Sequence, residues 1–264
     1  MKKIVLSLMI LGVSMPIWAA NTADYFRVWQ GFMRADLTRE QFLSNFPPFM
    51  KETVDLYQGQ ALVNYIVVLP PSDRPNYIPD EFALVALTSK QNYERIRATP
   101  EGQKYLAHHW DFFDKSISKS ADPLVNYELD RPTNLVHNRS YDMIGKSIDW
   151  ALGYNTVFIG TRKTDLDGTQ FLNHLKKHIE LTKAVMTPKG LQGYILIANE
   201  QYEIAYLNWD SKESHDHAGQ TQEGQDVFSD AKTFMDILMY TQAVPFVAGS
   251  PIQPGQAYST LQQQ

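Results

Sequence analysis

The chain has 264 residues, a formal net charge of −5 and no cysteine. Without cysteine it can form neither disulfides nor thiolate metal sites. The acidic balance also argues against nucleic acid as a partner, because binding to a phosphate backbone needs a basic surface.

The N-terminal residues have the layout of a secretory signal peptide. A short basic start at Lys2 is followed by an apolar run over residues 4–15 and then by small residues ending at Ala20. This order predicts that residues 1–20 are removed during export, with cleavage after Ala19 or Ala20. We therefore expect a periplasmic protein. No other segment approaches the length of a membrane-spanning helix, so no membrane span is predicted.

The rest of the chain contains an internal repeat. Residues 28–43 align with residues 157–172 without a gap, at an offset of 129 residues (157 − 28). After a longer loop in the first copy, residues 70–79, the offset becomes 122 (203 − 81), which aligns Glu81 with Glu203. An alignment kept over most of the chain, with one change located in a proline-rich loop, indicates a duplication.

Each copy follows the same order of predicted elements: strand, helix, strand, strand, interrupted helix, strand. The strands are predicted from their β-branched and aromatic residues, and the helices from the capping residues that precede them. Thr99 and Thr221 open a shared Thr-x-Glu-Gly-Gln motif, which we interpret as a new cap inside the interrupted helix. The predicted strands are residues 25–34, 61–69, 81–88 and 122–129 in the first copy, and 155–163, 190–198, 202–209 and 243–249 in the second. The predicted first helices are residues 39–57 and 169–186.

This order of elements is the split βαβ unit of the ferredoxin-like fold. With the interrupted helix that contains "SKQNYERIRATPEGQKY", it resembles the dimeric α/β-barrel superfamily, which includes antibiotic-biosynthesis monooxygenase-like proteins, haem-degrading monooxygenases and chlorite dismutase relatives. The resemblance implies an α+β fold in which two units pair their sheets. Because both units lie on one chain, we predict two tandem ferredoxin-like βαββαβ units packed as an intrachain α/β barrel. The oligomeric state stays open, and a monomer is compatible with this arrangement.

The predicted organisation after the signal peptide has four parts. Repeat 1 covers residues 21–130 and repeat 2 covers residues 154–250. The unmatched residues 131–153 are predicted to be a connector with an amphipathic helix from Tyr141 onwards. Residues 251–264 are predicted to be a loose tail.

Histidines and bulky aromatic residues distinguish the first repeat from the second. His108, His109 and Trp110 lie on the interrupted helix of repeat 1, whereas the matching positions of repeat 2 carry neither histidine nor tryptophan. Because duplicated units need not stay identical, we predict that repeat 1 keeps a ligand-sized space, with one histidine as ligand or proton-transfer group. The predicted ligand-binding residues are Trp29 and Phe32 from the first strand, Tyr65 from the second strand, and His108, His109 and Trp110 from the helix.

These residues favour an exported protein that binds a small hydrophobic or aromatic ligand, with haem as a candidate cofactor. Two alternatives stay open: a monooxygenase-like enzyme acting on a small aromatic substrate, and a non-catalytic interaction module. In the superfamily, haem-degrading members use an asparagine on the first strand and a tryptophan before the histidine of the second helix. This chain departs from that pattern, because residues 25–34 contain no asparagine and Trp110 follows the histidines.

No metal site is predicted. His174 and His178 share one helix face, and residues 215–217 read His-Asp-His, but the two groups lie on different helices at an offset that exceeds a coordination distance. We interpret these side chains as solvated helix faces and leave a weak zinc or copper site at residues 215–217 open.

Overall fold

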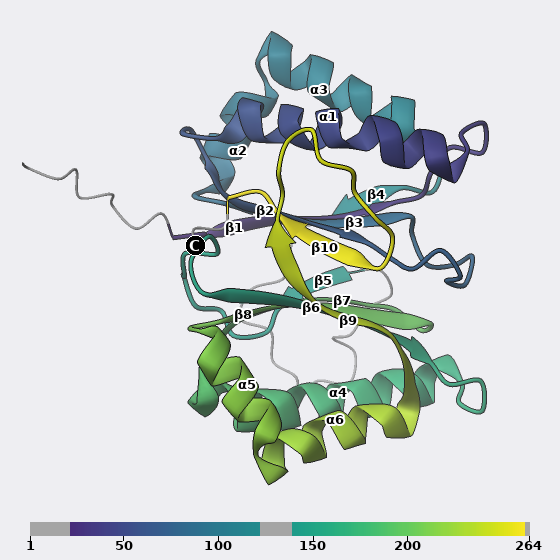
Figure 1. The fold of residues 1–264 in the computed structure, drawn as a ribbon, viewed down its shortest axis with the longest axis vertical. Coiled ribbons are helices and arrows are strands. Elements are labelled where there is room, and N and C mark those ends of the chain that lie inside the picture. The colour runs from purple at the N-terminus through teal and green to yellow at the C-terminus, as the bar shows by residue number, and fades with distance from the viewer. Residues whose placement is uncertain (1–21, 122–138, 262–264) are drawn as a thin grey trace, which may run out of the picture.

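The computed structural model describes residues 22–121 and 139–261, so the predicted signal peptide lies outside the described residues. Its strands form one ten-stranded sheet in the order β4-β1-β3-β2-β10-β9-β6-β8-β7-β5. The sheet curls so that its two halves lie face to face, with helices on both outer sides (Figure 1). This α+β arrangement confirms the predicted fold class.

The two repeats have the same topology. Each contributes four strands in the spatial order fourth, first, third, second, which is the ferredoxin-like order. Repeat 1 consists of β1 (Tyr25–Gly31), α1 (Arg39–Tyr57), β2 (Leu62–Leu69), β3 (Glu81–Leu87), α2 (Lys90–Arg97), α3 (Pro100–Phe112) and β4 (Lys119–Ala121). Repeat 2 consists of β6 (Tyr154–Arg162), α4 (Gly168–Met186), a 3-10 turn (Thr187–Lys189), β7 (Leu191–Ala198), β8 (Tyr202–Trp209), α5 (Lys212–Gln220), α6 (Gln222–Phe234) and β9 (Met235–Pro245).

The register of the strand pairs shows that the duplication found in the sequence is also present in the structure. Trp29 lies opposite Ala83 in repeat 1, and Phe158 lies opposite Ala205 in repeat 2. These pairs keep both offsets of the sequence alignment, 129 and 122 residues (158 − 29 and 205 − 83). Each position in one copy therefore has a defined counterpart in the other.

The shared Thr-x-Glu-Gly-Gln motif starts a new helix in both repeats, as predicted. The side chains of Thr99 and Thr221 accept hydrogen bonds from the backbone amides of Gly102 and Gly224. A Cβ at Gly102 would collide with the carbonyl oxygen of Ile96 in the preceding helix. A Cβ at Gly224 would collide with the carbonyl oxygen of Ala218 in the same way. The glycine is shared because the two helices approach too closely there for any side chain.

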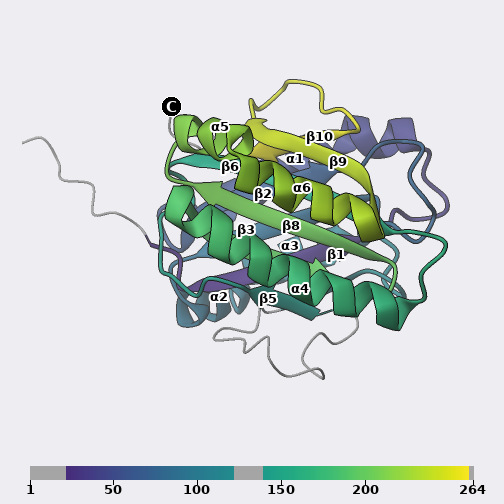
Figure 2. The same cartoon turned by 90° about the horizontal axis from the view of Figure 1, so that it is seen from below.

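Apolar residues form three layers of core. One layer lies between the two half-sheets and includes Val28 and Leu84 from repeat 1 and Ile159 and Ile204 from repeat 2. The other two lie between each half-sheet and its own helices. Figure 2 shows α4, α5 and α6 covering the outer face of repeat 2. Successive side chains of a strand point to opposite faces, so each strand serves two of these layers.

The C-terminal residues are not a loose tail, which corrects the sequence prediction. They form β10 (Gln256–Ser259), which pairs antiparallel with β2 and parallel with β9 and so joins the two half-sheets. Its Ala257 is completely buried between them. The strand is stable there because both neighbours offer unpaired backbone groups at their edges.

The helix predicted in the connector is also wrong for the part that the structure describes. Residues 139–142 form β5 (Arg139–Asp142), which pairs with β7 at the sheet edge. The Asp142 side chain then accepts hydrogen bonds from the amides of Ile144 and Gly145, and Gly145 has a φ of +69°. This turn prevents a helix from continuing.

The fourth strands begin earlier than predicted. In repeat 2, β9 starts at Met235, directly after α6, whereas the sequence predicts a strand over residues 243–249. In repeat 1, β4 covers Lys119–Ala121, and the predicted strand at residues 122–129 lies outside the described residues.

Candidate functional site

A cavity of about 370 Å³ lies in repeat 1, between the outer face of its half-sheet and its helices. β1, β3 and β4 contribute one side, and α1, α2 and α3 contribute the other. The lining residues are Arg27, Trp29, Thr53, Tyr57, Val85, Tyr93, Arg97, Tyr105, Leu106, His109, Trp110, Lys115, Ser118, Lys119 and Ser120.

Three of the six predicted site residues meet at this cavity. The rings of Trp29 and His109 lie edge to face, with centroids 5.4 Å apart, and the ring of Trp110 lies 6.0 Å from Trp29. Trp29 comes from β1, whereas His109 and Trp110 come from α3. Whether these residues bind a ligand stays a prediction.

Phe32, Tyr65 and His108 do not line the cavity. Phe32 follows β1 at an even-numbered position, like Phe26 and Val28, whose side chains pack between the two half-sheets. Trp29 lies on the opposite face of the strand, toward the helices. Strand alternation therefore separates Phe32 from Trp29. Tyr65 is buried beneath the helices in the same core as Trp29.

His108 points away from the cavity toward α1. Its Nδ1 lies 2.5 Å from Oε2 of Glu52, and both side chains are about one-third exposed. His108 is thus an interhelical surface contact, and His109 is the histidine that reaches the cavity.

The contacts of His109 fix its tautomer. Its Nδ1 lies 3.0 Å from the carbonyl oxygen of Tyr105, and a carbonyl can only accept, so Nδ1 carries the proton. Nε2 therefore presents a lone pair, and no described residue bonds it. Burial lowers the pKa of His109 to about 4, so the ring is neutral at neutral pH.

Hydroxyl groups tie the inner wall of the cavity together. Thr53 of α1 and Tyr105 of α3 share a hydrogen bond of 2.7 Å between their oxygen atoms. Burial raises the pKa of Tyr105 well above its ordinary value, so its hydroxyl keeps its proton. The Tyr105 ring also packs against His109, with centroids 4.6 Å apart.

Positive side chains surround the mouth of the cavity. Arg97, Lys115 and Lys119 are exposed, and Arg27 is half-buried. The Lys115 ammonium lies 5.5 Å from the ring centroid of Trp110, and the Arg27 guanidinium lies 5.6 Å from that of Tyr93. None of the described lining residues is acidic.

The matching space in repeat 2 is almost filled. Its cavity measures about 50 Å³ and is lined in part by Tyr240 and Trp209. Tyr240 pairs with Phe158 as Ser120 pairs with Trp29, so a large ring replaces a small hydroxyl side chain. This replacement, together with Trp209, leaves little room in repeat 2.

The histidines of repeat 2 correct a further expectation. His178 is not solvated: it is buried, its Nδ1 lies 2.9 Å from Oδ2 of Asp230, and burial lowers its pKa. His215 bonds the Tyr240 hydroxyl through Nε2, at 2.6 Å. In the part of the chain that the structure describes, no group of three or more potential ligands is arranged to hold a metal ion.

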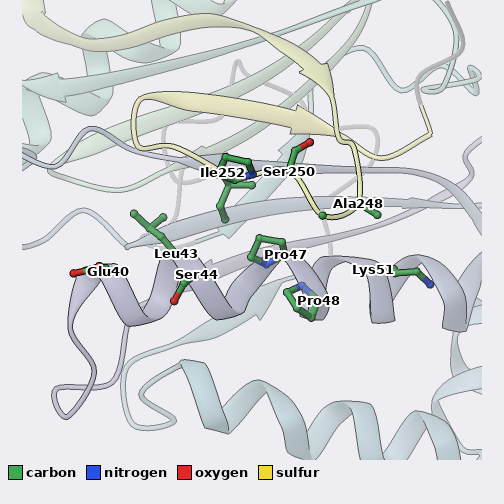
Figure 3. Close-up of a pocket in the computed structure, with 11 residues that line it drawn as sticks. Glu40, Leu43, Ser44, Pro47, Pro48, Lys51, Ala248, Ser250 and Ile252 are labelled. Atoms are coloured by element: carbon green, nitrogen blue, oxygen red, sulfur yellow. The ribbon is translucent and has the colours of Figure 1, made fainter.

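A larger groove of about 800 Å³ runs along α1, outside the repeat 1 cavity. Leu43 and Pro47 of α1 face Ile252 of the β9–β10 loop across it, and Glu40 and Lys51 lie toward its two ends (Figure 3). Both charged side chains are exposed, and no aromatic side chain lines the groove. It therefore offers fewer converging groups than the repeat 1 cavity.

The residues predicted from the sequence include none of the three tyrosines and none of the four cations that line the cavity. Two patterns could have found some of them. Alternation along β1 places Arg27 on the face of Trp29, and the spacing of four residues along α3 places Tyr105 with His109 and Leu106 with Trp110. No local pattern indicates Arg97 or Lys119, because only the folded sheet brings β4 beside α2.

No family model and no curated protein matches this chain. Solved structures with a similar fold include a putative monooxygenase from Lactobacillus acidophilus NCFM, at 11% identity and a TM-score of 0.41, covering 83% of this chain and 93% of that one. A putative monooxygenase from Fusobacterium nucleatum shows 9% identity and a TM-score of 0.40, covering 83% and 94%. An anthrone oxidase-like protein shows 12% identity and a TM-score of 0.39, covering 88% and 99%. These likenesses are too distant to carry an activity over to this chain.

Within the described residues, none of the helices is long and apolar enough to cross a bilayer.

Proposed function

We propose that this protein binds a small aromatic ligand in the cavity of repeat 1. The observation that carries the proposal is the difference between the copies, about 370 Å³ in repeat 1 against about 50 Å³ in repeat 2. A volume of about 300–1,000 Å³ is typical of small-molecule sites. The aromatic walls suit a flat ring, which gains from edge-to-face and offset packing.

His109 gives the site its polar anchor. Its unprotonated Nε2 accepts a hydrogen bond from a hydroxyl or amide of the ligand. A neutral imidazole whose other nitrogen donates to a carbonyl is also the arrangement found in metal-ligating histidines. The donor set therefore fits haem as a second candidate, with His109 as the residue that would hold the iron.

Binding is favoured over catalysis by the ionisable groups of the cavity. Apart from His109, they are tyrosines and cations, and His109 has a pKa of about 4, well below the range of an efficient general base at neutral pH. Of the two alternatives, a non-catalytic interaction module would bind neither probe. A monooxygenase-like enzyme would also bind the aromatic probe, and would be recognised by its conversion to an oxygenated product.

The test is a titration of the mature protein with 2-naphthol and with haem. Tryptophan fluorescence reports both, because Trp29 and Trp110 line the cavity, and haem also reports through its absorption spectrum. His109→Ala introduces the residue found at the equivalent position of repeat 2, Ala231. It is expected to weaken binding about tenfold, because one buried hydrogen bond is lost. His108→Ala is the matched control and should bind as the wild type does.

If neither 2-naphthol nor haem shows saturable binding, the proposal is overturned. Equal affinities of the two histidine variants would move the site away from His109. We also propose that the protein acts after export to the periplasm, and N-terminal sequencing of periplasmic material should begin at Ala20 or Asn21.

A further inference from the structure

We infer that the ligand of the repeat 1 cavity carries an anionic group, a carboxylate or a phosphate, which the cations at the cavity mouth hold. This inference rests on the proposed function, and it adds the charge of the ligand to it.

The first support is the composition of the mouth. Four cationic side chains line the cavity and none of its described lining residues is acidic, although the whole chain carries a net charge of −5. Among the described residues, neither Arg97 nor Lys119 forms an ion pair. Like charges gathered around one opening repel each other, and an anion placed between them removes that repulsion.

The second support is the comparison with repeat 2. Arg27 corresponds to Thr156 and Arg97 to Gly219 by the two offsets of the duplication. Lys119 pairs with Gln30 as Met239 pairs with Ile159, so those two residues are equivalent. The copy whose cavity is nearly filled therefore lacks the positive charge, and the copy with space has it.

The third support is the division of the site into two zones. Tyr57, Tyr93 and Tyr105 are buried at the bottom, whereas Arg97 and Lys119 are exposed at the top. A ring bound against the tyrosines thus directs a ring substituent toward the cations. A guanidinium offers two parallel N–H donors, which match the oxygen atoms of a carboxylate or a phosphate.

The test compares 2-naphthoate with 2-naphthamide by isothermal titration calorimetry. The two probes share the ring system and the shape of the substituent, and only the first is charged. We expect 2-naphthoate to bind at least about tenfold more tightly, because only its charge is attracted by the cations at the mouth. The difference should shrink as salt is raised, since the cations are exposed.

Charge-removing variants locate the effect. Arg97→Gln and Lys119→Gln should each weaken 2-naphthoate several-fold and leave 2-naphthamide unchanged. Lys104→Gln is the matched control, because Lys104 is an exposed cation of α3 that does not line the cavity. An equal loss in Lys104→Gln would show general attraction by surface charge and overturn the inference.

The outcomes separate the two proposals. If neither naphthalene probe binds, the proposed function fails. If both bind equally in the wild type and the variants, the proposed function stands and the charge inference fails. A third probe, 2-naphthyl phosphate, identifies the source of the charge: tighter binding than 2-naphthoate supports a phosphate, and weaker binding supports a carboxylate.

Discussion

Ser120 and Tyr240 occupy equivalent positions in the two repeats, and their difference in size separates an open cavity from a filled one. Ser120 lies opposite Trp29 across β4 and β1, and Tyr240 lies opposite Phe158 across β9 and β6. The ring of Tyr240 packs against Phe158 with centroids 6.3 Å apart, and its hydroxyl forms a hydrogen bond with Nε2 of His215. One residue in each copy thus decides much of the space beside the first strand.

Ser120→Tyr should strongly weaken ligand binding while the fold stays intact. Ser120 is exposed at the cavity mouth, so a tyrosine there has room to enter the cavity as Tyr240 does in repeat 2. We expect at least about a tenfold loss in affinity for 2-naphthol, with an unchanged circular dichroism spectrum. Ser116→Tyr, an exposed position that does not line the cavity, is the control. Wild-type affinity in Ser120→Tyr would place the ligand elsewhere.

Glu203→Gln should make the protein more stable at alkaline pH. Burial raises the pKa of Glu203 to about 8, against the hydrogen bond from the Tyr194 hydroxyl at 3.2 Å, which lowers it. The folded state therefore keeps a proton that the unfolded chain loses above the ordinary glutamate pKa of 4.5. Stability falls as the pH rises from about 4.5 to about 8, by up to about 1.4 kcal/mol per pH unit.

Urea denaturation at several pH values between 5 and 9 measures this slope. The amide of Glu203→Gln does not ionise and can still accept from Tyr194, so the slope due to this residue should disappear. Glu200→Gln, which changes an exposed carboxylate next to the same strand, should keep the wild-type slope. Parallel curves for all three proteins would show that Glu203 is ionised in the folded state.

His109 should produce the opposite dependence at acidic pH. Because burial lowers its pKa to about 4, the unfolded chain binds a proton below pH 6.5 before the folded chain does. Stability from this residue is complete above about pH 6.5 and is lost as the pH falls toward 4, by up to about 1.4 kcal/mol per pH unit. His109→Gln should flatten this part of the curve.

The matched control for His109→Gln is His217→Gln, since His217 is exposed on α5. Binding offers an independent measurement: the affinity for 2-naphthol should stay constant from about pH 8 to about pH 5.5, because Nε2 keeps its lone pair. A midpoint near the ordinary histidine pKa of 6.5 in the binding curve would mean that the ring titrates as an exposed histidine does.

Ala257→Asp should strongly destabilise the protein. Ala257 is completely buried between the two half-sheets, and an unpaired carboxylate there costs more than about 3 kcal/mol. Gln256→Glu, at the preceding half-buried position, should cost less than about 1 kcal/mol. Guanidinium denaturation measures both. Equal, small effects would mean that β10 is dispensable for joining the repeats.

The repeat, the order of its elements and the helix caps could all be predicted from the sequence. These features depend on interactions within a few residues: Thr38 and Asp167 form capping boxes with Gln41 and Gln170, and strand alternation follows from backbone geometry. A duplicated stretch carries this local information twice, so the ferredoxin-like order was predictable in both copies.

The way in which the connector and the C-terminal residues join the sheet became visible only in the folded structure. β5 and β10 are short, and neither has a local signal stronger than that of a loop. They become strands because β7 lacks a neighbour on one side and because β2 and β9 leave a gap that one strand fills. Pairing of this kind depends on groups far away in the sequence, which a pattern of neighbouring residues does not contain.

The candidate site, too, could be predicted from the sequence only in part. Trp29, His109 and Trp110 could be chosen from the sequence because they break the symmetry of the repeat. The choice between His108 and His109 needed the packing of α3, which turns His108 toward Glu52 of α1 and His109 toward Trp29 of the sheet. The cationic mouth needed the whole fold, because Arg97 and Lys119 meet only where α2 and β4 border one cavity.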